Sequence, residues 1–143
     1  MPITIKFKKL HKDAKLPSYA HEGDAGFDMF AIEKVVLKVG ERASIPTGLA
    51  MEIPKGCVGL FWDKSGLSHR AGIKTLGGVI DSSYRGEVKI GVVNLGQADF
   101  IFEPGDKVAQ MLIQKCETAK IKEVSVLKDT TRGEKGFGST GRK

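Results

Sequence analysis

Residues 88–97 have the sequence VKIGVVNLGQ, and this stretch decides the fold class. Val88, Ile90 and Val92 recur with a period of two, which places their side chains on one face of an extended strand. Leu95-Gly96-Gln97 follows directly, and its glycine is typical of a turn. The stretch therefore predicts a β-strand that ends in a tight turn.

The same alternation recurs on both sides of this strand. Apolar residues alternate in six further runs, at residues 3–7, 35–39, 49–53, 100–102, 108–112 and 124–126. Segments rich in glycine and proline separate the runs, and 18 glycines suit many tight turns. Only residues 65–71 are expected to form a helical turn. Many short strands at near-regular spacing predict an all-β fold, a jelly-roll-like barrel or sandwich.

The chain divides into a domain and a tail. Its 143 residues fit one domain, with 41% hydrophobic residues for a modest core. We expect a β-barrel domain over residues 1–128 and a C-terminal arm over residues 129–143. The arm holds four glycines and a single bulky apolar side chain, that of Phe137. It cannot build a core, so we expect it to be mobile until it closes over another surface.

Composition excludes several classes of protein. No apolar run is long enough to cross a membrane, and the first residues lack the apolar segment of a secretory signal, so we expect a cytoplasmic protein. Cys57 and Cys116 lie far apart in apolar runs, which predicts two buried thiols and no disulfide or zinc site. The net charge of +6 favours an anionic partner. Scattered lysines and few aromatic residues argue against nucleic acid.

Four glycine-centred clusters stand apart from the strand pattern: AGFDM at 25–29, DKSGLS at 63–68, GGVIDSSYRGE at 77–87 and RGEKGFGSTG at 132–141. The second and fourth combine cations, hydroxyls and glycines, a composition that suits phosphate oxygens. An ordinary turn explains either one taken singly. In the third, Val79 and Ile80 would hold Asp81 at the mouth of a hairpin, where a carboxylate can orient and deprotonate water. A carboxylate that only binds turn amides is the alternative.

Taken together, the clusters carry more information than any one of them. With GDKVAQ at 105–110, they resemble in order and content the five motifs of the trimeric dUTPase family. The match spans essentially the whole chain. The resemblance implies a homotrimer whose sites combine residues from several subunits. It also implies hydrolysis of dUTP to dUMP and pyrophosphate, which limits uracil in DNA and supplies dUMP for dTMP synthesis.

The resemblance implies roles for residues at the nucleoside. Asp81 would activate the water that attacks the α-phosphorus. Gly78, Val79 and Ile80 would hold uracil through backbone groups that mimic a pairing base. Tyr84 would pack on the deoxyribose and exclude a 2′-hydroxyl, so that UTP is rejected.

It also implies roles at the phosphates. Mg²⁺ would bridge the phosphate groups, and Asp28 would support the waters of the metal. The arm would close over the bound nucleotide, with Phe137 stacked on uracil and Arg132 near the γ-phosphate. The remaining contacts would come from Lys64, Ser65, Gly66, Gln110, Gly138, Ser139 and Thr140.

Two positions depart from the family pattern. Lys64 stands where the second motif usually has arginine, which removes a two-pronged phosphate donor. Lys135 replaces the first of two glycines that usually precede the aromatic residue of the arm. We hypothesise that activity survives with altered phosphate affinity.

Three other functions remain open from the sequence. One is dCTP deaminase, which shares this fold, but the glutamate it needs would fall at Gly91. Another is a non-catalytic dUTP-binding or regulatory protein on the same scaffold. The third is a nucleic-acid-binding barrel, which rests on the positive charge alone.

Overall fold

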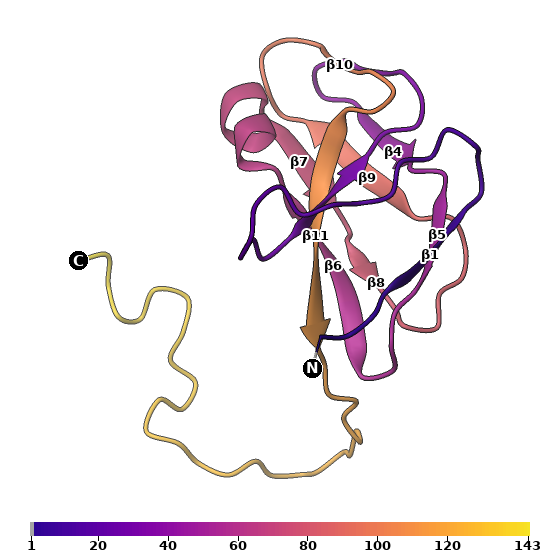
Figure 1. Cartoon of the computed structure of the whole chain (residues 1–143). Helices are drawn as coiled ribbons and strands as arrows, with labels where there is room; N and C mark the ends of the chain where they lie inside the picture. The colour runs from indigo at the N-terminus through magenta and orange to yellow at the C-terminus, as the bar shows by residue number, and fades with distance from the viewer. Residues whose placement is uncertain (1) are drawn as a thin grey trace.

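The computed structural model describes residues 2–143, and eleven strands form the body of the molecule (Figure 1). In chain order the elements are β1 (Lys6–Lys9), β2 (Phe27–Phe30), β3 (Val35–Leu37), β4 (Arg42–Pro46), β5 (Leu49–Glu52), β6 (Cys57–Asp63), the helical turn η1 (Leu67–Ala71), β7 (Ile73–Leu76), β8 (Val79–Ile80), β9 (Lys89–Asn94), β10 (Phe100–Phe102) and β11 (Lys107–Lys115).

The strands form four small antiparallel sheets. The largest has the order β2-β11-β6-β8, and a second has the order β4-β9-β7. Two further pairs, β1 with β5 and β10 with β3, complete the set. Neighbours in the sheets are distant in the chain, as in a jelly roll, where strands switch between two packed layers. The predicted all-β, jelly-roll-like class is confirmed.

The inward faces of these sheets meet in one core. Along β9 the alternation puts Ile90, Val92 and Asn94 inside, each fully buried. Burying an aliphatic side chain of this size contributes about 1.5–3 kcal/mol. Asn94 is tolerated because its amide donates to the Leu37 and Ala98 carbonyls at 3.0 and 2.9 Å. Its side chain therefore ties the end of β9 to two neighbouring segments.

Most of the predicted strands and the helical turn are confirmed, although β1 begins only at Lys6. Five strands were not predicted from the period of two, namely β2, β4, β6, β7 and β8. In β2 all four residues are buried, so no alternation is visible in its sequence. In β6 the buried positions include Gly59, whose missing side chain interrupts the apolar pattern.

Two predictions are wrong in the region after β11. Residues 124–126 form no strand, since the chain beyond Lys115 runs away from the barrel with no neighbouring edge to pair with (Figure 1). Cys116 is exposed, whereas Cys57 is buried as expected. The first error arises because alternation favours a strand only where a partner strand is present. Cys116 does have such a neighbour, since its amide donates to the Gly56 carbonyl at 2.9 Å, but its side chain is exposed. Among residues 2–143, no helix has the length and apolar character to span a membrane.

Candidate active site

The third motif lies between two sheets. β8 pairs with β6, with Gly59 opposite Ile80 and Leu60 opposite Val79, whereas β9 belongs to the other sheet. Residues 81–88 therefore cross between the sheets, and the expected regular hairpin is not formed. Gly78, the second residue of the motif, has a φ of +118°, a conformation that side chains disfavour. Its carbonyl accepts from the Phe61 amide at 2.9 Å.

Asp81 and Tyr84 are brought together in the crossing. The Tyr84 amide donates to the Asp81 carbonyl at 3.1 Å, which closes a turn. Asp81 is exposed and lies with Val79, Ile80 and Tyr84 around a cavity of about 150 Å³. A solvent-facing carboxylate beside a small cavity is positioned to act on a water molecule.

A second cluster forms at the end of β6, where two lysines meet one carboxylate. Lys64 Nζ lies 2.6 Å from Asp28 Oδ1, and Lys107 Nζ lies 3.2 Å from Asp28 Oδ2. Asp28 is 3% exposed. Burial raises the pKa of Asp28, but the hydrogen bonds and positive charges of the two lysines outweigh it and hold this pKa below its usual value. Asp28 is thus a buried anion that fixes two cations.

Lys107 was not among the predicted site residues. It lies inside the fourth motif, at the first position of β11. The motif alone does not show which side chains it faces. Asp28, Lys64 and Lys107 come together only because β2, β6 and β11 are neighbours in one sheet. No sequence signal other than the motif itself could have found it.

Gln110 is held against the same cluster. It lies opposite both Asp28 and Trp62 in the sheet, and its Nε2 donates to the Asp63 carbonyl at 3.0 Å. Gly26 makes room for it, since a Cβ at this position would lie 2.7 Å from Gln110 Oε1. The first motif therefore requires glycine next to the amide of the fourth motif.

Asp63 fastens the strand behind this cluster. Its Oδ1 accepts from the Thr75 amide and hydroxyl, both at 2.7 Å, and its Oδ2 lies 3.0 Å from Lys74 Nζ. Burial raises the pKa of Asp63, but the bonds from Thr75 and the charge of Lys74 hold it below its usual value. The Asp63 carboxylate therefore has a structural role, and it fixes the end of β6 directly before Lys64.

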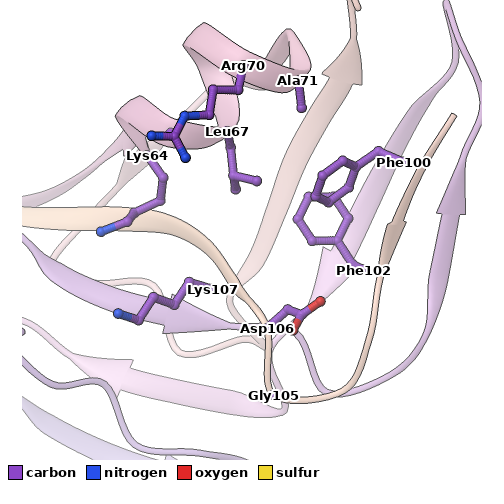
Figure 2. A pocket seen from close by; sticks show the side chains of 10 residues that line it. Lys64, Leu67, Arg70, Ala71, Phe100, Phe102, Gly105, Asp106 and Lys107 are labelled. Carbon is purple, nitrogen blue, oxygen red and sulfur yellow. The ribbon is translucent and has the colours of Figure 1, made fainter. Parts of the chain in front are cut away.

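A cavity of about 610 Å³ opens beside the two lysines (Figure 2). Lys64, Arg70 and Lys107 line it on one side, and Phe100 and Phe102 lie on the other. Gly66 also lines the cavity, and Ser65, directly before it in the chain, is exposed. The arrangement offers three positive charges, a hydroxyl and a glycine amide, which suits phosphate oxygens.

The arm residues are not brought to either cluster. Phe137 is fully exposed, and Arg132 Nε donates only to the Lys135 carbonyl, at 2.8 Å. Gly138, Ser139 and Thr140 are exposed as well. The two clusters also lie at different points on β6, because Leu60 and Lys64 are four residues apart, roughly 13 Å along a strand. One chain thus presents three separate parts of a site.

Comparison with known proteins identifies the family. The dUTPase family model matches residues 12–141. The deoxyuridine 5′-triphosphate nucleotidohydrolase of Clostridium kluyveri is 50% identical over 141 residues, which cover 97% of this chain and 99% of that protein. The protein of the same name from Mycolicibacterium vanbaalenii is 44% identical over 149 residues, covering 99% of this chain and 97% of that protein.

Solved structures agree with the sequence relatives. A mutant dUTPase of Staphylococcus bacteriophage 80alpha, solved with dUpNHpp, superposes with a TM-score of 0.92 at 32% identity and covers 97% of this chain and 99% of that one. A mutant dUTPase from phage phi11 of S. aureus, described for its coordination of a structural Mg(II) ion, superposes with a TM-score of 0.81 at 30% identity, covering 87% of this chain and 98% of that one. With the family model, the relatives and the fold in agreement, this chain belongs to the dUTPase family.

Proposed function

We propose that this chain hydrolyses dUTP to dUMP and pyrophosphate, with water attacking the α-phosphorus. Its role in nucleotide metabolism would be to limit uracil in DNA and to supply dUMP for dTMP synthesis. The observation that carries the proposal is the combination of family membership along the whole chain with the exposed Asp81 beside Tyr84. In this proposal Asp81 is the general base that orients and deprotonates the water.

The nucleoside end of the substrate fits the third motif. β8 is an edge strand of its sheet, so the outer side of Val79 and Ile80 presents backbone groups that no neighbouring strand occupies. Such groups can pair with the edge of uracil as another base would. Gly78 packs against Phe61 directly before them, and Tyr84 would pack on the deoxyribose, where it excludes a 2′-hydroxyl.

The phosphate end fits the lysine cluster. Lys64 and Lys107 carry the charge, and Asp28 holds both ammonium groups by direct ion pairs. Ser65 and Gly66 add a hydroxyl and an amide. Gln110, fixed by its bond to the Asp63 carbonyl, would lie near the α-phosphate and the attacking water. Lysine supplies point charges here in place of the forked donor of arginine.

Mg²⁺ fits this chain as an ion carried by the nucleotide. Residues 2–143 hold no group of three or more His, Cys, Asp or Glu side chains that could bind a metal. The nearest buried carboxylate, Asp28, already faces two ammonium groups. Mg²⁺ commonly keeps several waters and binds through substrate phosphates. The bound ion would neutralise charge on the leaving pyrophosphate. Asp28 would support its waters only by giving up one of these two ion pairs.

We further propose a homotrimer in which the arm completes the site. We propose that the barrel spans residues 1–128 and the arm residues 129–143. The arm lies away from the strands (Figure 1), and its Phe137 side chain is fully exposed. Closing on a partner subunit would stack Phe137 on uracil and bring Arg132 to the γ-phosphate. Gly138, Ser139 and Thr140 would line the closed arm. Two free cysteines suit a cytoplasmic protein in a reducing compartment.

The deaminase alternative has no support in the site. Gly91 stands where its glutamate would be needed, and a Cβ there would lie 3.0 Å from the Leu76 carbonyl oxygen. β9 runs between β4 and β7 at this position, with Gly91 opposite Ser44 and Leu76. The position therefore lacks both the acid and the space for one.

A substrate panel tests the proposal. Pyrophosphate release is measured with dUTP, dCTP, dTTP, dATP, dGTP and UTP in the presence of Mg²⁺, and the solution mass is measured on the same preparation. We expect release from dUTP far above that from the others, and the mass of a trimer. Intact dUTP after prolonged incubation contradicts the proposed activity, and deaminated product from dCTP supports the alternative instead.

A further inference from the structure

Gly86 is a glycine whose backbone does not require it. It is not among the glycines with a left-handed φ, so an alanine could adopt its conformation. Its surroundings do require it. A Cβ at Gly86 would lie 2.5 Å from Tyr84 Oη, 2.7 Å from Tyr84 Cζ and 3.0 Å from Tyr84 Cε2. All three nearest atoms belong to one side chain, so the tyrosine ring lies directly over this glycine.

The tyrosine is fastened in that position at both ends. Its hydroxyl donates to the Glu87 carbonyl at 2.8 Å, and its amide donates to the Asp81 carbonyl at 3.1 Å. Arg85 Nη1 braces the turn between them, at 2.7 Å from the Ser82 carbonyl oxygen and 3.1 Å from that of Tyr84. The ring is exposed to solvent on its outer side, yet it has a fixed direction.

The residue that accepts the hydroxyl is itself anchored to the barrel. Glu87 Oε2 accepts from the Gly48 amide at 3.2 Å, in the connection between β4 and β5. The next carbonyl, that of Val88, accepts from the Thr47 hydroxyl at 2.6 Å. The chain of contacts from Tyr84 therefore ends on the short, buried connection between β4 and β5.

We propose that Gly86 is a positioning residue for specificity: the missing side chain lets the Tyr84 ring lie against the turn and bond to Glu87, and this fixed ring rejects a 2′-hydroxyl on the sugar. The inference rests on the proposed function, since it assigns the sugar to Tyr84. Steric rejection works only where the rejecting group cannot move aside, because a mobile ring would yield to the extra oxygen. Gly86 and Glu87 supply that rigidity.

The structure determines how a substitution at this position would be accommodated. In Gly86→Ala the new methyl group overlaps the outer part of the ring, which is the end of a side chain and can swing away. The backbone and the core need not change, so the fold is retained. The swing breaks the bond to the Glu87 carbonyl and frees the ring beside Asp81.

The test compares catalytic efficiency, kcat/KM, for dUTP and for UTP in the wild type and in Gly86→Ala. Thermal unfolding is recorded alongside. We expect the dUTP-to-UTP ratio to fall at least tenfold in Gly86→Ala with little change in Tm. The matched control is Gly86→Ala in a Tyr84→Ala background, where the ring is absent. There the glycine substitution should leave the ratio within twofold of Tyr84→Ala alone.

Two outcomes would overturn the inference. One is an unchanged ratio in Gly86→Ala, and the other is an equal fall in the Tyr84→Ala background, which would show that the effect bypasses the ring. If Gly86→Ala does not fold, Tyr84→Phe takes its place, because it removes only the hydroxyl that bonds to Glu87. This variant should also lower the dUTP-to-UTP ratio, and an unchanged ratio would contradict the inference. A wild type that leaves dUTP intact refutes the proposed function itself, whereas a selective wild type with an insensitive Gly86 refutes only this inference.

Discussion

Asp81 and Lys64 represent two kinds of functional residue in this chain. Asp81 is exposed, and the bonds of its turn leave its carboxylate free for chemistry. Lys64 is partly buried and already paired with Asp28 at 2.6 Å. A free carboxylate suits proton transfer, while a cation held by a buried anion suits a fixed phosphate contact. The two residues therefore predict different kinetic effects.

Replacing Asp81 by asparagine should separate catalysis from binding. The amide keeps the size and polarity of the side chain but loses its basicity, so Asp81→Asn should lower kcat by roughly 10²–10⁴-fold. The affinity for a non-hydrolysable dUTP analogue should remain close to that of the wild type. Single-turnover kinetics and calorimetric titration measure the two quantities. A variant with normal turnover would remove Asp81 from the mechanism.

Replacing Lys64 by arginine should strengthen the phosphate contact. The guanidinium group keeps the ion pair with Asp28 and adds a second donor for a phosphate oxygen. We expect a KM for dUTP about tenfold lower, which corresponds to about 1.4 kcal/mol, with kcat little changed. Lys64→Met is the control, since it removes the charge and should raise KM. A lower kcat/KM in Lys64→Arg would show that the lysine is the better fit here.

At the scale of elements, β6 organises the site. Its middle residues pair with β8, which carries the third motif, and its end carries Asp63 and Lys64. β11 lies on its other side and presents Gln110. A register shift between Lys107 and Ala109 changes which residues of β11 face the core, so that Met111 is buried while Gln110 faces the cluster. Strand pairing thus brings the second and fourth motifs together at the end of β6 and attaches the third motif farther along the same strand.

The contacts of Asp63 predict a pH-dependent contribution to stability. Its pKa is held below the usual 3.8 by Thr75 and Lys74 against the effect of burial. A lowered folded-state pKa means that the stabilisation is present above the unfolded pKa and is lost as pH falls through the folded one. Asp63→Asn should therefore lower the free energy of unfolding by about 2 kcal/mol at neutral pH.

Denaturant titrations of Asp63→Asn and the wild type from about pH 7 to about pH 2.5 test this. The difference between the two proteins should shrink once the pH passes below 3.8. Lys74→Met is the control, because it keeps the bonds from Thr75 to Asp63. It removes the partly exposed ion pair, worth at most about 1 kcal/mol, together with the 3.5 Å contact of Lys74 Nζ with Thr75 Oγ1. A constant difference across the whole range would mean that the charge of Asp63 does not contribute.

At the scale of the whole molecule, the barrel and the arm have different physical requirements. The barrel buries its apolar side chains in one core, whereas the segment after β11 leaves Ile121, Val126, Leu127 and Phe137 exposed. An exposed series of large apolar side chains is costly for a single chain and favours burial against another one. These side chains are the structural support for the proposed trimer.

Removing the arm should spare the fold and damage the enzyme. A chain that ends at Thr130 loses no core residue, so its Tm should remain within a few degrees of the wild type. It also loses the stacking of Phe137 on uracil, worth roughly 1–3 kcal/mol, and the contacts of Arg132. We expect kcat/KM to fall by about 5- to 150-fold from the stacking alone, measured by pyrophosphate release. Phe137→Ala isolates that share, and an unimpaired truncated enzyme would contradict the closing arm.

The sequence by itself determined the all-β class and the order of the motifs. Both depend on local properties, since alternation sets which way side chains point along a strand and glycine marks where the chain turns. Val88, Ile90 and Val92 are enough to predict β9, whereas the hairpin predicted around Asp81 is not formed.

Only the tertiary structure decided which distant residues meet. Asp28, Lys64 and Lys107 form one cluster because three strands pair side by side, and nothing local to any of them specifies that pairing. The missing strand at residues 124–126 has a related origin, as alternation becomes a strand only when an edge is available. Strand register and burial depend on the whole fold, and they determine which charged side chains form ion pairs.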